Sequence, residues 1–457
     1  MGEPTEPKGP YAHQLIYLND TARGLAVLPL INHAGEPATG CGLVPFLLNG
    51  QLMSTTLNET AKNDALHPRP VKGLSKSAIN SLSFATPDDV QDLVCFTHLR
   101  WDFVYQRPQH LLSRASRQWR VWYIEEPVWC ETLRLEVRSV NDRIRVVVPH
   151  LPHGLDGETT LRLHRQLIDQ FIEREQLNDF IAWYYTPMAL PFSDHLQPRL
   201  TVYDCMDHLA AFSEASPHLL AQEERLMQKA DLVYTGGYSL YEAKQKLHSQ
   251  AFAFPSCIDL EHFMPGRGDM PDPEDQRAIG GPRIGFSGVI DERIDLQLLG
   301  QLAQRRPEWQ FIMLGPVVKI DHATLPQAAN IHYLGMKNYR DLPAYFSNWQ
   351  VAMMPFALNE ATRYISPTKT PEYLAAGLPV VSTPIRDVVR SYGGWGPVLI
   401  GDTVPAFEKA IELALNASYE SDWAGVDAVL KAQSWDNTWQ QMQGLIEAQL
   451  QEITLNQ

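Results

Sequence analysis

Two charged residues three positions apart, Lys369 and Glu372, mark the stretch with the clearest potential for chemistry. Pro371 is tolerated only in the first turn of a helix, so a helix is predicted to begin near residues 368–370. At this spacing both side chains share one face of the helix start, where free N–H groups and the positive end of the dipole favour anions. Lysine there suits a phosphate, and a first-turn carboxylate suits two sugar hydroxyls. The alternative is a helix start with only a local Lys–Glu pair.

The residues after Glu372 predict how this pair is positioned. Gly377 is expected to end the helix in a left-handed conformation, and Pro379 prevents its continuation. Val380 and Val381 then open a short buried strand. The pair is therefore expected at a loop–helix junction that leads directly into a sheet.

The whole stretch, SPTKTPEYLAAGLPVVST from Ser366 to Thr383, resembles the donor-nucleotide motif of the GT-B glycosyltransferases that build surface polysaccharides from UDP- or GDP-sugars. In that family the glutamate binds the nucleotide ribose and the lysine contacts the diphosphate. The resemblance therefore implies these two roles for Glu372 and Lys369. It implies that Ser366 and Thr368 belong to the same donor-binding segment.

A glycine turn after a strand is the second candidate donor contact, in GFSGVIDERID (Gly285–Asp295). Gly288 would let the backbone approach a diphosphate, and Arg293 could neutralise the charge; the alternative is a surface arginine. Family members often carry an arginine directly after this glycine and a lysine further on, where this chain has Val289 and Arg293. They also often carry a glutamate near the transferred sugar, where this chain has Tyr364.

The third cluster follows the first predicted strand, in HLRWDFVYQRPQH (residues 98–110). Loops at the carboxyl ends of parallel strands face the ligand in doubly wound sheets. An attacking sugar hydroxyl must lose a proton, so His98 and Asp102 are the candidate bases. The alternative is that the acidic residues cap helices or hold loops. The polar groups expected at this edge are His98, Arg100, Asp102, Arg107, Asp204 and Asp207.

Strand-like apolar runs alternate with helical patterns from residue 92 onward, which indicates an α/β fold with parallel sheets. The polar, Gly- and Pro-rich stretch GRGDMPDPEDQRAIGGP interrupts this alternation, as a linker would. We expect two Rossmann-like, doubly wound domains that face a cleft (GT-B), with an extra N-terminal extension. The expected parts are the extension of unknown role (1–88), an acceptor domain (89–265), a linker (266–282), a donor domain (283–435) and a helix that crosses back to the first domain (436–457).

Composition narrows the class of protein. With 457 residues, 44% hydrophobic and 20% charged, the chain is typical of a globular protein. A net charge of −15 argues against nonspecific nucleic-acid binding. The five cysteines lack zinc-site spacing, so a reducing compartment and no structural metal are expected. The sequence shows no secretory signal and no run long enough to span a bilayer, which favours a cytoplasmic location.

Contact with the inner surface of the cell membrane is a further hypothesis. Arg107, Arg114 and Arg117 recur at helical spacing and follow Trp101, Phe103 and Tyr105. Basic and aromatic groups together suit an anionic interface. The alternative is that these residues line the cleft or pack internally.

The leading functional hypothesis is transfer of a sugar from a nucleotide-sugar donor to a hydroxyl of a surface glycan or glycolipid. The donor is a co-substrate, and neither a cofactor nor a metal is expected, since no Asp-x-Asp pair is evident. A noncatalytic protein that binds nucleotide sugars is the alternative, favoured by Tyr364 and Val289. An epimerase on the same fold, acting on the donor alone, has no support in the sequence.

Overall fold

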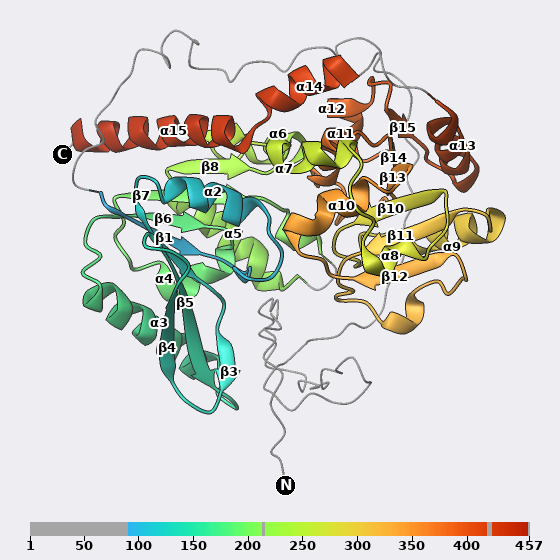
Figure 1. The fold of residues 1–457 in the computed structure, drawn as a ribbon. Coiled ribbons are helices and arrows are strands. Elements are labelled where there is room, and N and C mark those ends of the chain that lie inside the picture. The colour runs from blue at the N-terminus through green and yellow to red at the C-terminus, as the bar shows by residue number, and fades with distance from the viewer. Residues whose placement is uncertain (1–89, 213–214, 418–422, 456–457) are drawn as a thin grey trace.

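The structure is a computed structural model that describes residues 90–212, 215–417 and 423–455. The N-terminal extension expected over residues 1–88 lies outside the described residues. Two largely parallel sheets form two α/β domains, which confirms the expected fold class (Figure 1). Strands β1 to β9 build the first sheet, and strands β10 to β15 build the second.

The first sheet has the order β3-β5-β2-β1-β6-β7-β8-β9, with β4 paired to β5. Its central strands are buried along their full length, as expected for parallel strands covered by helices on both faces. The strands are β1 (Asp92–Phe96), β2 (Arg120–Ile124), β3 (Val128–Cys130), β4 (Arg134–Ser139), β5 (Ile144–Pro152), β6 (Phe180–Tyr184), β7 (Leu200–Cys205), β8 (Leu232–Thr235) and β9 (Ala251–Ala253). The helices are α2 (Arg107–Ala115), α3 (Gly157–Arg174), α4 (Leu190–Ser193), α5 (Pro217–Lys229) and α6 (Tyr238–Lys244), with the 3-10 turns η1 (Pro187–Ala189) and η2 (Leu209–Ala211).

The second sheet has the order β12-β11-β10-β13-β14-β15. Its strands are β10 (Arg283–Ser287), β11 (Gln310–Leu314), β12 (Ile331–Gly335), β13 (Val351–Met354), β14 (Val380–Ser382) and β15 (Val398–Ile400). Its helices are α9 (Leu296–Arg305), α10 (Leu342–Phe346), α11 (Lys369–Ala375), α12 (Arg386–Tyr392) and α13 (Val404–Asn416), with the 3-10 turns η4 (His322–Thr324) and η5 (Tyr339–Asp341). Three short elements follow β9 and precede β10 in the sequence: α7 (Leu260–Phe263), η3 (Met264–Arg267) and α8 (Glu274–Arg277).

The last two helices are α14 (Trp423–Ala432) and α15 (Trp435–Leu455). Figure 1 shows α15 (red) lying along the first domain, beside α2. Trp439, Met442 and Ile446 of α15 belong to the same buried apolar cluster as strands β1, β2, β6, β7 and β8. The C-terminal helix therefore completes the core of the first domain.

Asp387 of α12 joins the second domain to the first. Its carboxylate accepts hydrogen bonds from the N–H (3.0 Å) and the hydroxyl (2.5 Å) of Ser239 in α6. Gly237 leaves no room there for a side chain, since an added Cβ would clash with Asp387 and with Ser366. Glu242 of α6 is also held, at 2.6 Å, by each of two arginines of α12. The donor-motif segment therefore begins at a tight contact between the domains.

Candidate functional site

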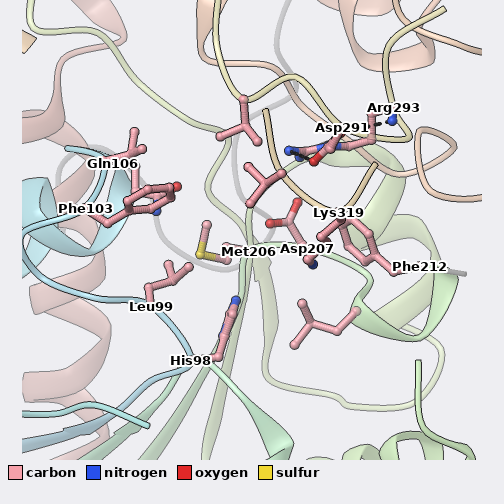
Figure 2. A pocket seen from close by; sticks show the side chains of 14 residues that line it. His98, Leu99, Phe103, Gln106, Met206, Asp207, Phe212, Asp291, Arg293 and Lys319 are labelled. Atoms are coloured by element: carbon pink, nitrogen blue, oxygen red, sulfur yellow. Dashed lines mark hydrogen bonds and ion pairs between the residues drawn. The ribbon is translucent and has the colours of Figure 1, made fainter. Parts of the chain in front are cut away.

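A pocket lies between the two domains, at the carboxyl ends of parallel strands from both sheets (Figure 2). The loops after β1 and β7 supply His98 and Asp207 from the first domain. The loops after β10 and β11 supply Asp291, Arg293 and Lys319 from the second. Its cavity measures about 70 Å³, small beside the 300–1,000 Å³ or so of pockets that bind small molecules. The cavity by itself is therefore too small to hold a whole nucleotide sugar.

Two groups of the first domain could take a proton in this pocket. Burial, and next the positive charge of Lys319, lower the pKa of His98 to about 4, so its imidazole is neutral at neutral pH. Burial raises the pKa of Asp207, while the nearby Arg293 opposes that shift. A base whose pKa moves toward the working pH accepts protons more effectively. Asp207 therefore fits the role of base better than His98.

The second domain supplies the positive charge. Arg293 forms an ion pair with Asp291 at 2.7 Å, and its guanidinium carbon lies 5.8 Å from the centre of the Phe212 ring. Lys319 Nζ lies 5.1 Å from the centre of the same ring. Figure 2 shows Asp207, Asp291 and Arg293 across the pocket from Phe103 and Gln106. Arg293 thus lines the pocket together with a second cation, Lys319; its contact with a diphosphate stays a prediction.

Lys319 and Phe212 were missed at the level of the sequence. Lys319 follows the buried strand β11 in GPVVKID, which is the same kind of position as that of Arg293 after β10. That common position was an available signal. Phe212 had no such signal, because its role depends on two cations from the other domain.

The Lys369–Glu372 pair lies outside the lining of this pocket. Helix α11 begins at Lys369, and Gly377 has a φ of +78°, which confirms both predicted ends. Lys369 Nζ lies 2.8 Å from Glu372 Oε2, and Glu372 is 7% exposed. Burial, and next the charge of Glu372, raise the pKa of Tyr339 in η5. The local pair foreseen as the alternative is thus present.

Tyr339 connects this pair to the first domain. Its ring stacks on Tyr105 at a centroid distance of 5.0 Å and on His262 at 4.3 Å. His110 packs edge-on against Tyr339 and stacks on Trp435. Rings of the first domain therefore pack against Tyr339 of the second.

The other donor-site candidates have partners within the protein. The N–H of Gly288 donates to the carbonyl of Leu314 at 2.9 Å, so it is not free for a phosphate. Ser366 contacts Gly237 of the first domain. Thr368 precedes α11 and makes no side-chain cap, although its carbonyl accepts from the N–H of Glu372 at 3.4 Å. The close approach of the backbone to a diphosphate at Gly288 stays a prediction.

Asp102 lies in a different place from the one expected of a base. It forms an ion pair with Arg138 of β4 at 2.6 Å, with 53% of its side chain exposed, and it does not line the pocket. The antiparallel strand β4, which supplies Arg138, was not predicted. Arg100 also has a structural role, since it donates to Glu125 at 2.9 Å and to the carbonyl of Glu126 at 2.6 Å. The candidate base therefore moves from Asp102 to the loop after β7.

The arginines expected to form a basic face on α2 each pair with an acidic residue of the protein. Arg107 is buried against Asp204, with Nη2 2.8 Å from Oδ1. Arg114 and Arg117 both pair with Asp436 of α15, at 2.7 and 2.9 Å. These arginines therefore form no free basic surface, and the basis for membrane contact through this face is lost.

Three buried histidines predict a pH dependence of stability. Burial lowers the pKa of His98 to about 4 and those of His110 and His164 to about 3, from 6.5. Between those values the unfolded chain binds protons that the folded chain does not. The free energy of unfolding should therefore fall as pH drops from 6.5 toward 4, by up to roughly 1.4 kcal/mol per pH unit for each histidine.

Urea unfolding across that pH range checks this. The His110→Phe variant should show a shallower fall, because one titrating group is gone and the stack on Trp435 is kept. An unchanged pH slope in His110→Phe would show that His110 is not neutral in the folded protein.

In the described part of the chain, no helix is long and apolar enough to cross a membrane. Across the same residues, no group of three or more His, Cys, Asp or Glu side chains could hold a metal ion.

Comparisons with known proteins agree with this architecture. Residues 281–417 match the family model "Glycosyl transferases group 1". The Bacillus subtilis (strain 168) protein TuaH, provisionally named a teichuronic acid biosynthesis glycosyltransferase, is 25% identical over 234 residues, or 48% of this chain. The matched region spans 59% of that relative's length.

Solved structures share the two-domain fold. A trehalose-6-phosphate synthase structure, OtsA, has a TM-score of 0.59 at 13% identity, covering 79% of this chain and 99% of its own. The sucrose-phosphate synthase of Thermosynechococcus elongatus has a TM-score of 0.58 at 14% identity, covering 78% and 98%. The chain thus has the GT-B fold, and residues 281–417 of its second domain are similar to the group 1 glycosyltransferases.

Proposed function

We propose that the protein transfers a sugar from a UDP- or GDP-sugar to a hydroxyl of a surface glycan or glycolipid acceptor. The observation that carries this is the pocket between the domains. It brings two candidate proton acceptors, His98 and Asp207, to face two cations, Arg293 and Lys319. Glycosyl transfer needs both functions, since the acceptor hydroxyl loses a proton while the nucleoside diphosphate leaves with negative charge.

In this proposal the donor lies along the second domain. Glu372 accepts bonds from the ribose hydroxyls, and Lys369 contacts the diphosphate. Arg293 and Lys319 stabilise the charge that develops on the leaving phosphate, where preorganised cations are most effective. Asp207 orients the acceptor hydroxyl and takes its proton.

The chemical class of the acceptor is the most specific part of the proposal. The B. subtilis relative, named for teichuronic acid biosynthesis, supports a surface glycan. The solved structures are synthases of small sugar phosphates, and at this identity they support the fold alone. A cytoplasmic enzyme that meets its acceptor at the inner face of the membrane is consistent with the proposal.

The test is a donor panel of UDP- and GDP-sugars with purified protein and cell-envelope lipid extracts, followed by mass spectrometry of the products. We expect one donor to yield a product heavier than its acceptor by one sugar residue. A protein that binds a donor but neither hydrolyses nor transfers it would support the alternative, a noncatalytic nucleotide-sugar-binding protein.

Transfer is expected to need no divalent metal, because Arg293 and Lys319 supply positive charge where the leaving diphosphate is proposed to lie. The rate with the donor identified above should be unchanged after dialysis against EDTA and after addition of Mg²⁺ or Mn²⁺. Loss of transfer in EDTA, restored by either ion, would contradict this.

A further inference from the structure

A second, smaller pocket lies within the first domain, at the carboxyl ends of β2, β1 and β6. Thr97 lines this pocket, and the next residue in the chain, His98, lines the pocket between the domains. Its volume of about 20 Å³ leaves room for about one water-sized group. The residues that matter here are Thr97, Glu125, His164, Thr186, Met188 and Phe192.

His164 of α3 has an unusual environment. The side chain is 2% exposed, and its Nε2 has no hydrogen-bond partner among the described residues. The imidazole stacks on Phe192 with a centroid distance of 3.8 Å. A buried polar atom without a partner destabilises a protein, so an unpaired imidazole beside a pocket indicates a group that binds there.

Glu125 and Glu126 also line this pocket, and Arg100 binds both residues. Glu125 accepts from Arg100 at 2.9 Å and from the N–H of Trp101 at 2.8 Å. Arg100 also donates to the carbonyls of Glu126 and Pro127. With the arginine fully engaged and two carboxylates nearby, the pocket disfavours phosphates and other anions.

The remaining walls suit a group that is apolar on its sides and polar at its tip. Met188 and Phe192 are apolar. The hydroxyl of Thr186 accepts from the N–H of Met188 at 3.2 Å and can still donate. A primary alcohol on one methylene has this character, and the hydroxymethyl arm of a hexose projects from the ring far enough to enter a narrow pocket.

We infer that this pocket receives the hydroxymethyl group of a neutral hexose in the acceptor, with His164 Nε2 as its hydrogen-bond partner. The inference rests on the proposed function, because it places the acceptor near the pocket between the two domains, where the sugar is proposed to be transferred. His164 then discriminates hexoses from 6-deoxyhexoses, as a buried polar group does when an analogue leaves it unpaired.

The experiment uses the full chain and pairs of methyl hexopyranosides with their 6-deoxy counterparts of the same configuration. Affinities come from saturation-transfer NMR titrations, and the nitrogen shifts of the His164 imidazole report contact. For at least one pair, wild type should bind the hexoside about tenfold more tightly, as loss of about 1.4 kcal/mol implies. In His164→Phe this preference should fall below about twofold.

Two controls accompany the variant. His195→Phe replaces a histidine that pairs with Asp169 away from the pocket, and it should keep the preference. His164→Phe should melt at the same or a higher temperature, because an unpaired polar atom is removed. If it does not fold, Thr186→Val carries the same test.

Three results would overturn the inference. Wild type could bind every hexoside and its 6-deoxy counterpart equally, His164→Phe could keep the preference, or the nitrogen chemical shifts of His164 could stay unchanged when the hexoside is added. In those cases His164 serves only to bind an ordered water. Failure of the proposed function is seen separately, as the absence of nucleoside diphosphate release from every donor by wild type.

Discussion

Arg107→Ala should destabilise the first domain by roughly 3–5 kcal/mol, because it leaves the Asp204 carboxylate buried without its partner. Both residues are at most 1% exposed. The guanidinium makes three contacts with that carboxylate, at 2.8–3.0 Å, and one with the carbonyl of Phe254 at 2.7 Å. No other described side chain is shown pairing with Asp204 as a cation, so the loss should not be compensated.

Urea unfolding followed by tryptophan fluorescence measures this loss as a lower midpoint at unchanged slope. Arg117→Ala is the matched control, since Arg117 lies in the turn just after the same helix and its pair with Asp436 is largely exposed. Exposed pairs contribute roughly 0–1 kcal/mol. A double variant, Arg107→Met with Asp204→Leu, should recover much of the stability, because an apolar pair can replace a buried ionic one.

Equal midpoints for Arg107→Ala and Arg117→Ala would show that the buried pair has no special weight. A double variant as unstable as Arg107→Ala alone would point instead to the contact with Phe254.

The fate of Arg107 shows where sequence reasoning ends. Its helix and the proline in the first turn were predicted correctly, because both follow from local rules. Its partner, Asp204, is 97 residues away on β7. The sequence pattern of a basic helical face is the same whether the face contacts solvent, a ligand or a buried carboxylate. Periodicity therefore located the helix but not the partner of its arginine.

Strands that are buried on both faces were predicted well, whereas β4 was not. The central parts of two such strands, residues 93–96 and 284–286, carry no polar side chain and are buried, a pattern typical of a covered parallel strand. Strand β4 reads RLEVRS, is largely exposed, and pairs antiparallel to β5. Such a short polar segment is hard to distinguish from a loop, and missing it meant missing Arg138, the partner of Asp102.

Spacing in the sequence predicted the Lys369–Glu372 pair, but it predicted less of the pocket between the two domains. Lys369 and Glu372 meet because they lie three residues apart on one helix. His98, Asp207, Arg293 and Lys319 meet because strands from two sheets end at one cleft. That second kind of proximity depends on strand order and domain packing, which no single stretch encodes.

The largest functional effect is expected from Glu372→Ala. If the carboxylate accepts bonds from both ribose hydroxyls, its removal costs roughly 1.5–3 kcal/mol per charge-assisted bond, without simple additivity. The affinity for the free nucleoside diphosphate should then fall by about ten- to a few-hundredfold. Lys369→Ala should also weaken binding, and salt should reduce that effect because it screens the diphosphate charge.

Controls are needed here because the ion pair between Lys369 and Glu372 has the same geometry whether Glu372 binds the donor or only stabilises the helix. Glu360→Ala removes another pair of i,i+3 spacing, with Arg363, whose glutamate side chain is 72% exposed. It should leave nucleotide binding unchanged. Glu372→Gln should bind more tightly than Glu372→Ala, because it keeps an oxygen that can accept from a hydroxyl.

Titration calorimetry with UDP and GDP, alongside melting curves, separates the two interpretations. A donor-binding role predicts lost affinity with little change in melting temperature. A purely local role predicts full nucleotide affinity and a loss of stability larger than the roughly 0.3–0.5 kcal/mol of a surface helix pair, because the side chains of Lys369 and Glu372 are only 19% and 9% exposed. If Glu372→Ala binds the wild type's preferred nucleotide as tightly as wild type does, Glu372 is a helix-stabilising residue and the donor ribose lies elsewhere in the cleft.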